Sequence, residues 1–341
     1  MVSRSAARGA AVNRSAARLV CLFPLMFLLL FSCATLPPSQ EEAHWMGVLP
    51  PLSPDSLYAS VDVASSRSLL KILAATAGSE LEQLERLTAK LSRVHTRIRL
   101  AQGEPPDFAM IALGDLTSGS VARRLDLDPA WERVQLERMP GRGFTSTHWS
   151  YRTYWRKGNL QVAVPQRSVL LASGGDPAGA ETLLRRFHAP GSDRLPAEVS
   201  AELEGADLFF YLPDPLALAA ISLSASSAQD PAVVFQRLPI RQLWISAAGS
   251  GAAGGEDYEL EVVFLLSEVE NPRAVETLLR LMLTLWMRKV QAEDPVGKLK
   301  AATIRTDGGS ARIESLTLSP AELASFFQIL LPVNLVTGQQ P

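Results

Sequence analysis

The chain has 341 residues, with 33 basic and 35 acidic side chains, a formal net charge of −2 and 47% hydrophobic residues. This composition excludes a disordered chain, a collagen and a protein with many membrane-spanning helices. Two cysteines are too few for a disulfide scaffold, and the length allows two domains with apolar cores of their own.

The first segment has the layout of an export signal. An apolar run from Leu19 to Phe31 follows a stretch without acidic residues that carries four arginines, namely Arg4, Arg8, Arg14 and Arg18. The run ends in Leu30-Phe31-Ser32-Cys33, which resembles the lipobox of bacterial lipoprotein precursors. The resemblance implies diacylglyceryl transfer to the Cys33 thiol, removal of residues 1–32 as a signal peptide, and acylation of the new amino terminus.

Two alternatives remain open for this segment. Residues 19–36 are long enough to serve as an uncleaved signal anchor, and an ordinary secreted protein is the other alternative. Pro24 within the apolar run and the position of Cys33 favour cleavage. We therefore expect a lipid-anchored protein of the bacterial cell envelope, on the outer membrane or periplasmic face, whose first partner is the bilayer that holds the acyl chains of Cys33.

Cleavage would change the charge and the redox chemistry of the chain. Cys21 lies within the signal, so no cysteine remains for a disulfide in the folded part. Removing the four arginines leaves 29 basic against 35 acidic residues, a net charge of about −6. This balance argues against nucleic-acid binding, which depends on neutralising phosphates.

Residues 33–56 are rich in proline and lack any hydrophobic period, so they predict a tether, with Trp45 marking a contact. Regular alternation starts at Leu57, and residues 57–204 predict a first α+β repeat. The expected helices lie at 81–94, at 118–125 and after Asp176-Pro177. The expected strands lie at 57–63, 96–101, 107–114, 131–138, 147–156, 159–165 and 168–173.

Residues 205–330 predict a second α+β repeat, followed by a tail at 331–341. Its expected strands lie at 207–212, 241–248, 257–266, 299–306 and 311–318. Helices are expected after Asp214-Pro215, Asn271-Pro272 and Ser319-Pro320, because a capping side chain followed by proline suits the first turn of a helix.

The two halves therefore predict tandem repeats of a β-α-β-β-α-β-β-α unit, in an α+β fold whose antiparallel sheets carry helices on one face. Two unrelated α+β segments remain the alternative, because the halves share little residue identity. The pattern resembles a loose group of exported bacterial proteins without assigned functions, and that resemblance implies no active site.

Short matches to catalytic motifs do not identify an enzyme. Residues 249–254 fit a dinucleotide fingerprint, but a strand follows them where the fingerprint needs a helix. Residues 68–71 fit a serine–lysine pair, which we interpret as the start of a helix with a solvated lysine. The four histidines are scattered, and we interpret them as surface or capping residues. We therefore expect no catalytic residue, no cofactor and no metal.

An aromatic and basic hairpin at about 139–158 in the first repeat has no counterpart in the second. On a strand there, Trp149, Tyr151, Thr153 and Trp155 would share one face, opposite Tyr154 and the arginines. Aromatic side chains beside arginine are typical of sites that bind an envelope protein or an anionic polymer. The candidate binding surface therefore consists of Trp149, Tyr151, Arg152, Tyr154, Trp155 and Arg156. The alternative is an ordinary strand, with Trp149, Tyr151 and Trp155 facing the core and the arginines facing solvent.

Taken together, the sequence predicts a noncatalytic lipoprotein that acts as a binding or structural module. An envelope hydrolase or lipid-handling protein with a nonlocal site is the alternative. A carrier of an apolar ligand is a third hypothesis, suggested by Met282, Trp286 and Met287 on the helix at 272–290, where ordinary packing explains the same residues.

Overall fold

The computed structural model describes most of the folded chain. The described residues are 44–76, 89–100, 107–116, 118–136, 153–176, 178–192, 195–203, 205–217, 238–249, 257–267 and 271–330. The signal segment, the lipobox and the predicted tail at 331–341 lie outside them.

The first half of the fold contains seven described strands. They are β1 (Ser56–Asp62), β2 (Leu91–Arg99), β3 (Asp107–Gly114), β4 (Glu132–Gln135), β5 (Thr153–Lys157), β6 (Leu160–Gln166) and β7 (Val169–Gly174). The helices of this half are α3 (Arg67–Thr76), α5 (Ser118–Leu127), α6 (Gly179–His188) and α7 (Ala197–Leu203).

The second half contains five described strands, with helices between and after them. The strands are β8 (Leu208–Leu212), β9 (Ile240–Gly249), β10 (Tyr258–Leu266), β11 (Thr303–Asp307) and β12 (Ser310–Leu318). The helices are α10 (Pro272–Lys289), α11 (Pro295–Ala301) and α12 (Pro320–Leu330).

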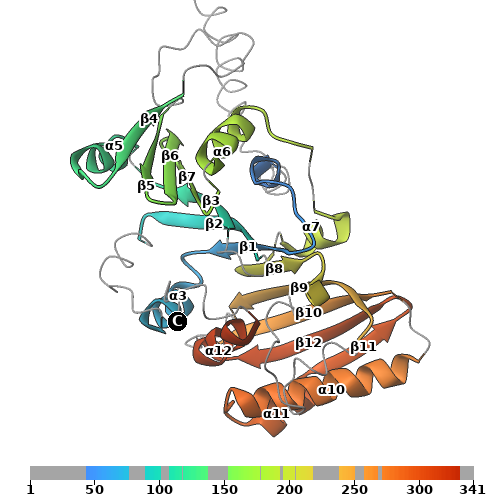
Figure 1. Ribbon diagram of the computed structural model, residues 1–341. Helices are drawn as coiled ribbons and strands as arrows, with labels where there is room; N and C mark the ends of the chain where they lie inside the picture. The colour runs from blue at the N-terminus through green and yellow to red at the C-terminus, as the bar shows by residue number, and fades with distance from the viewer. Residues whose placement is uncertain are drawn as a thin grey trace, which may run out of the picture. The chain divides into compact units, whose positions relative to one another are not determined.

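All of these strands join one antiparallel sheet of twelve strands, in the order β11-β12-β10-β9-β8-β1-β2-β3-β7-β6-β5-β4 (Figure 1). The α+β class and the antiparallel pairing are confirmed, but one sheet replaces the separate sheets that the sequence predicts. The halves meet where β1 pairs with β8, with Ser60 opposite Phe209. Reading outward from this pair, the order β1-β2-β3-β7-β6 matches β8-β9-β10-β12-β11, and the β4–β5 hairpin extends only the first half.

Helices cover both faces of the sheet, so the prediction that they pack on one face is wrong. Successive side chains of a strand point to opposite faces, and Leu57 and Tyr58 of β1 accordingly belong to different hydrophobic clusters. The first cluster contains side chains of α3, α10 and α12. The second contains side chains of α6, α7 and the segment 45–49. We name these sheet faces the α10 face and the α6 face.

The folded unit begins before Leu57, and the predicted tether is therefore too long. Residues 44–48 form a helical turn, and Trp45, Met46, Val48 and Leu49 are buried in the second cluster. Trp45 stacks on Phe187 of α6 with 6.4 Å between ring centroids. Burial of these apolar side chains outweighs the irregular, proline-rich character of the surrounding sequence.

Two of the predicted helix caps are confirmed, whereas the cap at Asp176 is wrong, because α6 begins at Gly179 with Ala178 at its N-cap position and no side-chain cap hydrogen bond. The Asn271 side chain accepts a hydrogen bond from the Ala274 N–H, and Ser319 and Glu322 form a reciprocal capping box at the start of α12. Asp294 caps α11 in the same way by accepting from the Gly297 N–H. The predicted strand at 299–306 is consequently wrong at its start, because α11 continues to Ala301.

The predicted helix at 81–94 is wrong at its end, because Leu91 already belongs to β2. Residues 77–88 lie outside the described residues. Pairing of β2 between β1 and β3 overrides the local three- and four-residue spacing of leucines that favoured a helix.

Candidate functional site

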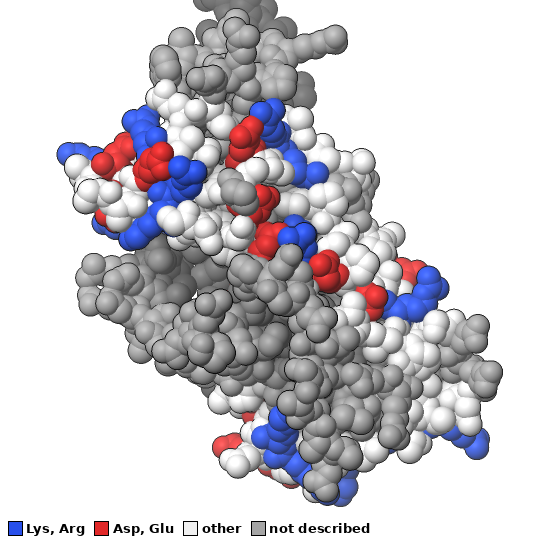
Figure 2. Space-filling view, in the orientation of Figure 1, with Lys and Arg blue, Asp and Glu red and all other residues white. Residues whose placement is uncertain are grey.

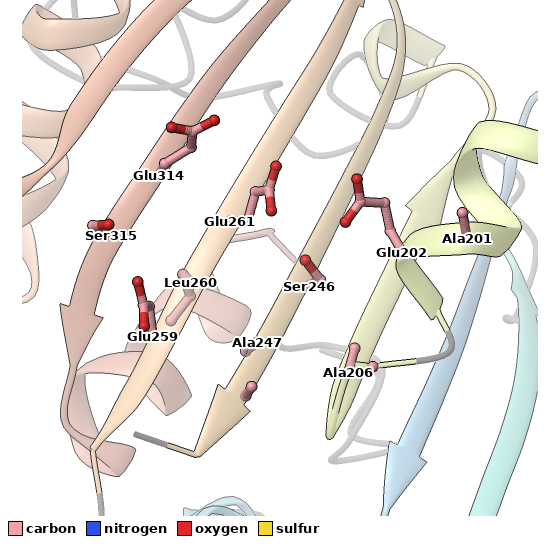
Figure 3. A pocket seen from close by; sticks show the side chains of 12 residues that line it. Ala201, Glu202, Ala206, Ser246, Ala247, Glu259, Leu260, Glu261, Glu314 and Ser315 are labelled. Atoms are coloured by element: carbon pink, nitrogen blue, oxygen red, sulfur yellow. The ribbon is translucent and has the colours of Figure 1, made fainter. Parts of the chain in front are cut away.

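An open cleft of about 490 Å³ lies on the α6 face of the second half (Figure 3). Residues of α7 and of the segment after it, Gly205 and Ala206, border it on one side, and the strands β9, β10 and β12 supply the rest of its lining. Four glutamates, Glu202, Glu259, Glu261 and Glu314, line this cleft.

The glutamates reach the cleft because apolar neighbours fix the elements that carry them. Val199 and Leu203 of α7 are buried, which leaves Glu202 facing the cleft from the exposed side of the helix. On β10, Leu260 and Val262 pack into the cluster on the α10 face. Strand alternation therefore directs Glu261 to the opposite face.

A β-bulge shapes the cleft wall between β10 and β12. Leu260 pairs with Leu316 while Val262 pairs with Ile313, so Glu261 lies opposite two residues, Glu314 and Ser315. Ser315 has a φ of 57°, a left-handed conformation that is costly for a residue with a side chain. Bulges of this kind redirect side chains and occur often beside functional sites.

One arginine connects two of the glutamates across the cleft. Arg312 Nη1 lies 2.7 Å from Glu261 Oε1 and 3.4 Å from Glu202 Oε1. Partial burial raises the pKa of Glu261, and the negative charges of Glu202 and Glu314 raise it further, against the opposing effect of Arg312. Burial disfavours the charge on Arg312, but its bonds to these carboxylates raise its pKa overall.

The cleft has more carboxylate hydrogen-bond acceptors than basic side chains to pair with them, because Arg312 forms ion pairs with only two of the four glutamates in the described part of the chain. Glu314 has a longer contact with Arg305, at 3.6 Å, and the Arg305 side chain is well exposed. Carboxylates held in place by a shared guanidinium keep unused lone pairs for further donors. The arrangement is suited to hold polar groups of a ligand that donate hydrogen bonds.

The structure describes half of the predicted aromatic and basic surface. Trp149, Tyr151 and Arg152 lie outside the described residues. Tyr154 and Trp155 are both buried on β5, so they cannot form part of an exposed surface, and their prediction as surface residues is wrong. Arg156 is exposed and lies 2.7 Å from Glu132 of β4.

Tyr154 and Trp155 are both buried because β5 is covered on both faces. Tyr154 packs into the cluster on the α6 face. Trp155 points the other way, and its Nε1–H donates a hydrogen bond of 2.8 Å to Asp126 of α5. The alternative interpretation as core is therefore correct for Trp155, whereas the burial of Tyr154, predicted on the same face as the arginines, was not expected.

The other motifs are placed as follows. Gly249 ends β9, and residues 250–256 lie outside the described residues. Ser68 and Lys71 lie near the start of α3, where the sequence predicts a helix start. No group of three His, Cys, Asp or Glu side chains within the described ranges is arranged to hold a metal ion.

His95 differs from the predicted surface or capping role because it is fully buried on β2. The Tyr58 hydroxyl lies 2.9 Å from its Nδ1. Burial, assisted by the positive charge of Arg93, lowers the pKa of His95 to about 3, so its ring is neutral at pH 7.

The sequence did not identify the glutamates of the cleft. Residues 202, 261 and 314 are far apart in the chain and meet only through the pairing of β10 with β12 and the packing of α7. The available signal was the charged Glu259 and Glu261 within an otherwise apolar strand, because charged residues on a strand mark its uncovered face.

No family model matches the chain, and no curated protein matches it significantly. Solved structures do show a similar fold. Crystal form III of TP0453 aligns with a TM-score of 0.57 and 15% identity, covering 83% of this chain and 96% of that one. Crystal form IV gives a TM-score of 0.56 at 14% identity, covering 83% of this chain and 95% of that one.

At this identity the likeness establishes the fold alone, an α+β architecture with a large antiparallel sheet. Among the described helices, none combines the length and the hydropathy needed to cross a bilayer.

Proposed function

We propose that this protein is a lipid-anchored lipoprotein of the bacterial cell envelope whose folded part is a noncatalytic binding or structural module. The anchor rests on Leu30-Phe31-Ser32-Cys33 and on the export-signal layout of the residues before it. Acyl chains contribute about 0.8 kcal/mol of membrane affinity for each buried methylene, so two or three of them give a lasting attachment.

The open cleft on the α6 face is the observation that supports a binding role. Its floor is a sheet, whose backbone is held by pairing on both sides of β9 and β10. Two of its glutamates, Glu261 and Glu202, are held in place by Arg312 between them. A preformed polar surface of this kind loses little conformational entropy when a partner binds.

The test is capture of partners from the native envelope by the full-length lipidated protein. The double variant Glu259→Gln with Glu314→Gln removes two cleft charges and keeps the size of the side chains. The matched control is Glu276→Gln on α10, where Glu276 Oε1 lies 3.1 Å from Arg280 Nη2 on the same helix. We expect the double variant to lose a partner that the wild type and the control retain; equal capture by all three proteins would contradict the proposal.

An envelope hydrolase or lipid-handling protein is the second candidate, and the raised pKa of Glu261 supports it. A carboxyl group with a raised pKa in a cleft is a candidate general acid. Hydrolysis of envelope lipids or glycans that is lost in Glu261→Gln, with the fold unchanged, would favour this candidate.

We also propose that the fold arose by tandem duplication of a β-α-β-β-α-β-β-α unit. The matching strand order outward from the β1–β8 pair supports this proposal, as do the helices α5 and α10, which both follow the third strand of their half. The β4–β5 hairpin would then be an insertion in the first unit. Separate expression of residues 205–341 tests the proposal, because a duplicated unit should fold cooperatively by itself.

A further inference from the structure

Two of the four exposed large hydrophobic side chains in the described residues belong to neighbouring elements at one end of the sheet. They are Leu127, which is 73% exposed at the end of α5, and Leu160, which is 38% exposed at the start of β6. We name this region the α5–β5 corner and define it as residues 118–136 and 153–160. The Trp155 to Asp126 hydrogen bond and the contacts of α5 with β6 bring its parts together.

The α5–β5 corner is basic although the chain as a whole is slightly acidic. It contains five basic residues, Arg123, Arg124, Arg133, Arg156 and Lys157, against three acidic ones, Asp126, Asp128 and Glu132. Figure 2 shows Lys and Arg side chains in this region of the molecule, with acidic side chains among them.

Two of these five basic side chains remain available to bind anionic groups of a partner. Arg133 and Arg156 face Asp126 and Glu132, at 3.8 Å and 2.7 Å. Arg123 and Arg124 are exposed and have no ion-pair partner among the described residues. They lie four and three positions before Leu127, so all three side chains share one side of α5.

A partly exposed aromatic ring completes the α5–β5 corner. Lys157 lies over the Trp131 ring, with its Nζ 5.9 Å from the ring centroid. Exposed leucines, a tryptophan and snorkelling basic side chains are the groups that settle at the interface between lipid headgroups and acyl chains.

We propose that the α5–β5 corner is a second, noncovalent membrane contact that rests on the surface of an anionic bilayer. This inference rests on the proposed lipid anchor, because a tethered protein meets the bilayer at high effective concentration. The cations would be attracted to anionic headgroups, while Leu127 and Leu160 enter the headgroup region.

The test uses the full-length lipidated protein in vesicles, either of phosphatidylcholine alone or with 30% phosphatidylglycerol. A spin label is placed at Leu127→Cys or Leu160→Cys, and the control label at Leu281→Cys on α10, where Leu281 is 45% exposed outside the corner. Collision with oxygen and with a water-soluble nickel complex reports whether each label lies in lipid. We expect the labels at 127 and 160 to lie in lipid on anionic vesicles, and the control label to remain in water.

The double variant Arg123→Gln with Arg124→Gln removes two positive charges of the corner and leaves its exposed leucines in place. It therefore measures the contribution of charge to membrane contact. We expect it to weaken the contact of the label at 127 about 25-fold, since each basic residue near an anionic surface contributes about five-fold. Labels at 127 and 281 with equal accessibility, or a contact that is the same on both kinds of vesicle, would overturn the proposal. If Cys33 carries no acyl chain, the proposed anchor is refuted. The labels at 127 and 160 then still report whether the corner contacts anionic vesicles by itself.

Discussion

Glu322 connects three parts of the second half, and its replacement should be the most destabilising single change at a charged residue in that half. Its carboxylate accepts hydrogen bonds of 2.8 Å from the backbone N–H groups of Ser319 and Glu293. It also pairs with Lys298 of α11, and its own side chain is only 7% exposed.

The expected loss of unfolding free energy follows from the groups that lose their partner in Glu322→Ala. Two part-buried N–H groups lose their acceptor, at about 1–3 kcal/mol each, and the Lys298 ammonium loses its partner. Solvent reaches Lys298 in part, so the lower end of the range for a broken buried pair applies, and we expect a loss of about 3 kcal/mol. The control Glu276→Ala breaks an exposed pair within α10 and should cost less than about 0.5 kcal/mol.

The measurement is urea unfolding of both variants, followed by circular dichroism and by tryptophan fluorescence. Burial opposes ionisation of Glu322, but the bonds from Lys298 and from the two backbone N–H groups lower its pKa overall. A carboxylate with a lowered folded pKa adds stability above its unfolded pKa of about 4.3, and this stability is lost as the pH falls through the folded pKa. A loss below about 1 kcal/mol at pH 7 would refute the reasoning, as would an unchanged acid slope in Glu322→Gln.

Three further changes test other parts of the structure. Wild-type His95 stays neutral when folded and takes up a proton when unfolded, so the free energy of unfolding decreases as the pH falls from about 6.5 to about 3. In His95→Phe this decrease should be smaller, and the same decrease in both proteins would contradict the prediction. Ser315→Gly should stabilise the protein by about 1 kcal/mol in urea unfolding, because it relieves the left-handed conformation, and lower stability would show that the Ser315 side chain is needed. Arg97→Met should leave the melting temperature unchanged or raise it, because Arg97 is buried and its Nε has no hydrogen-bond partner among the described residues; a large decrease would reveal an interaction of the guanidinium.

The sequence predicted most strands and helix starts, because their signals are local. Asn271-Pro272 and Ser319-Pro320 fix the starts of α10 and α12 through a side-chain acceptor and a preset φ. Asp294-Pro295 carries the same signal, but the strand predicted at 299–306 overlaps the end of α11, and this helix was not predicted.

Features that depend on distant parts of the chain could not be predicted. Alternation places Leu57 and Tyr58 on opposite faces, but it does not say which helix covers each face. Trp155 was placed in the candidate surface because arginines lie next to it in the sequence, whereas its hydrogen-bond partner on α5, Asp126, is 29 residues earlier in the chain. The cleft requires Glu202 of α7 to meet Glu261 and Arg312 across two separate stretches of sequence.

The central claim is that Cys33 becomes the lipid-bearing first residue of the mature protein. Mass spectrometry of the protein purified from its native membrane measures this directly. We predict an amino-terminal peptide that starts at Cys33 and carries a diacylglyceryl group and an amide-linked fatty acid, and we predict its loss in Cys33→Ser. A peptide that starts at Met1, or an unmodified Cys33 thiol, would contradict the claim.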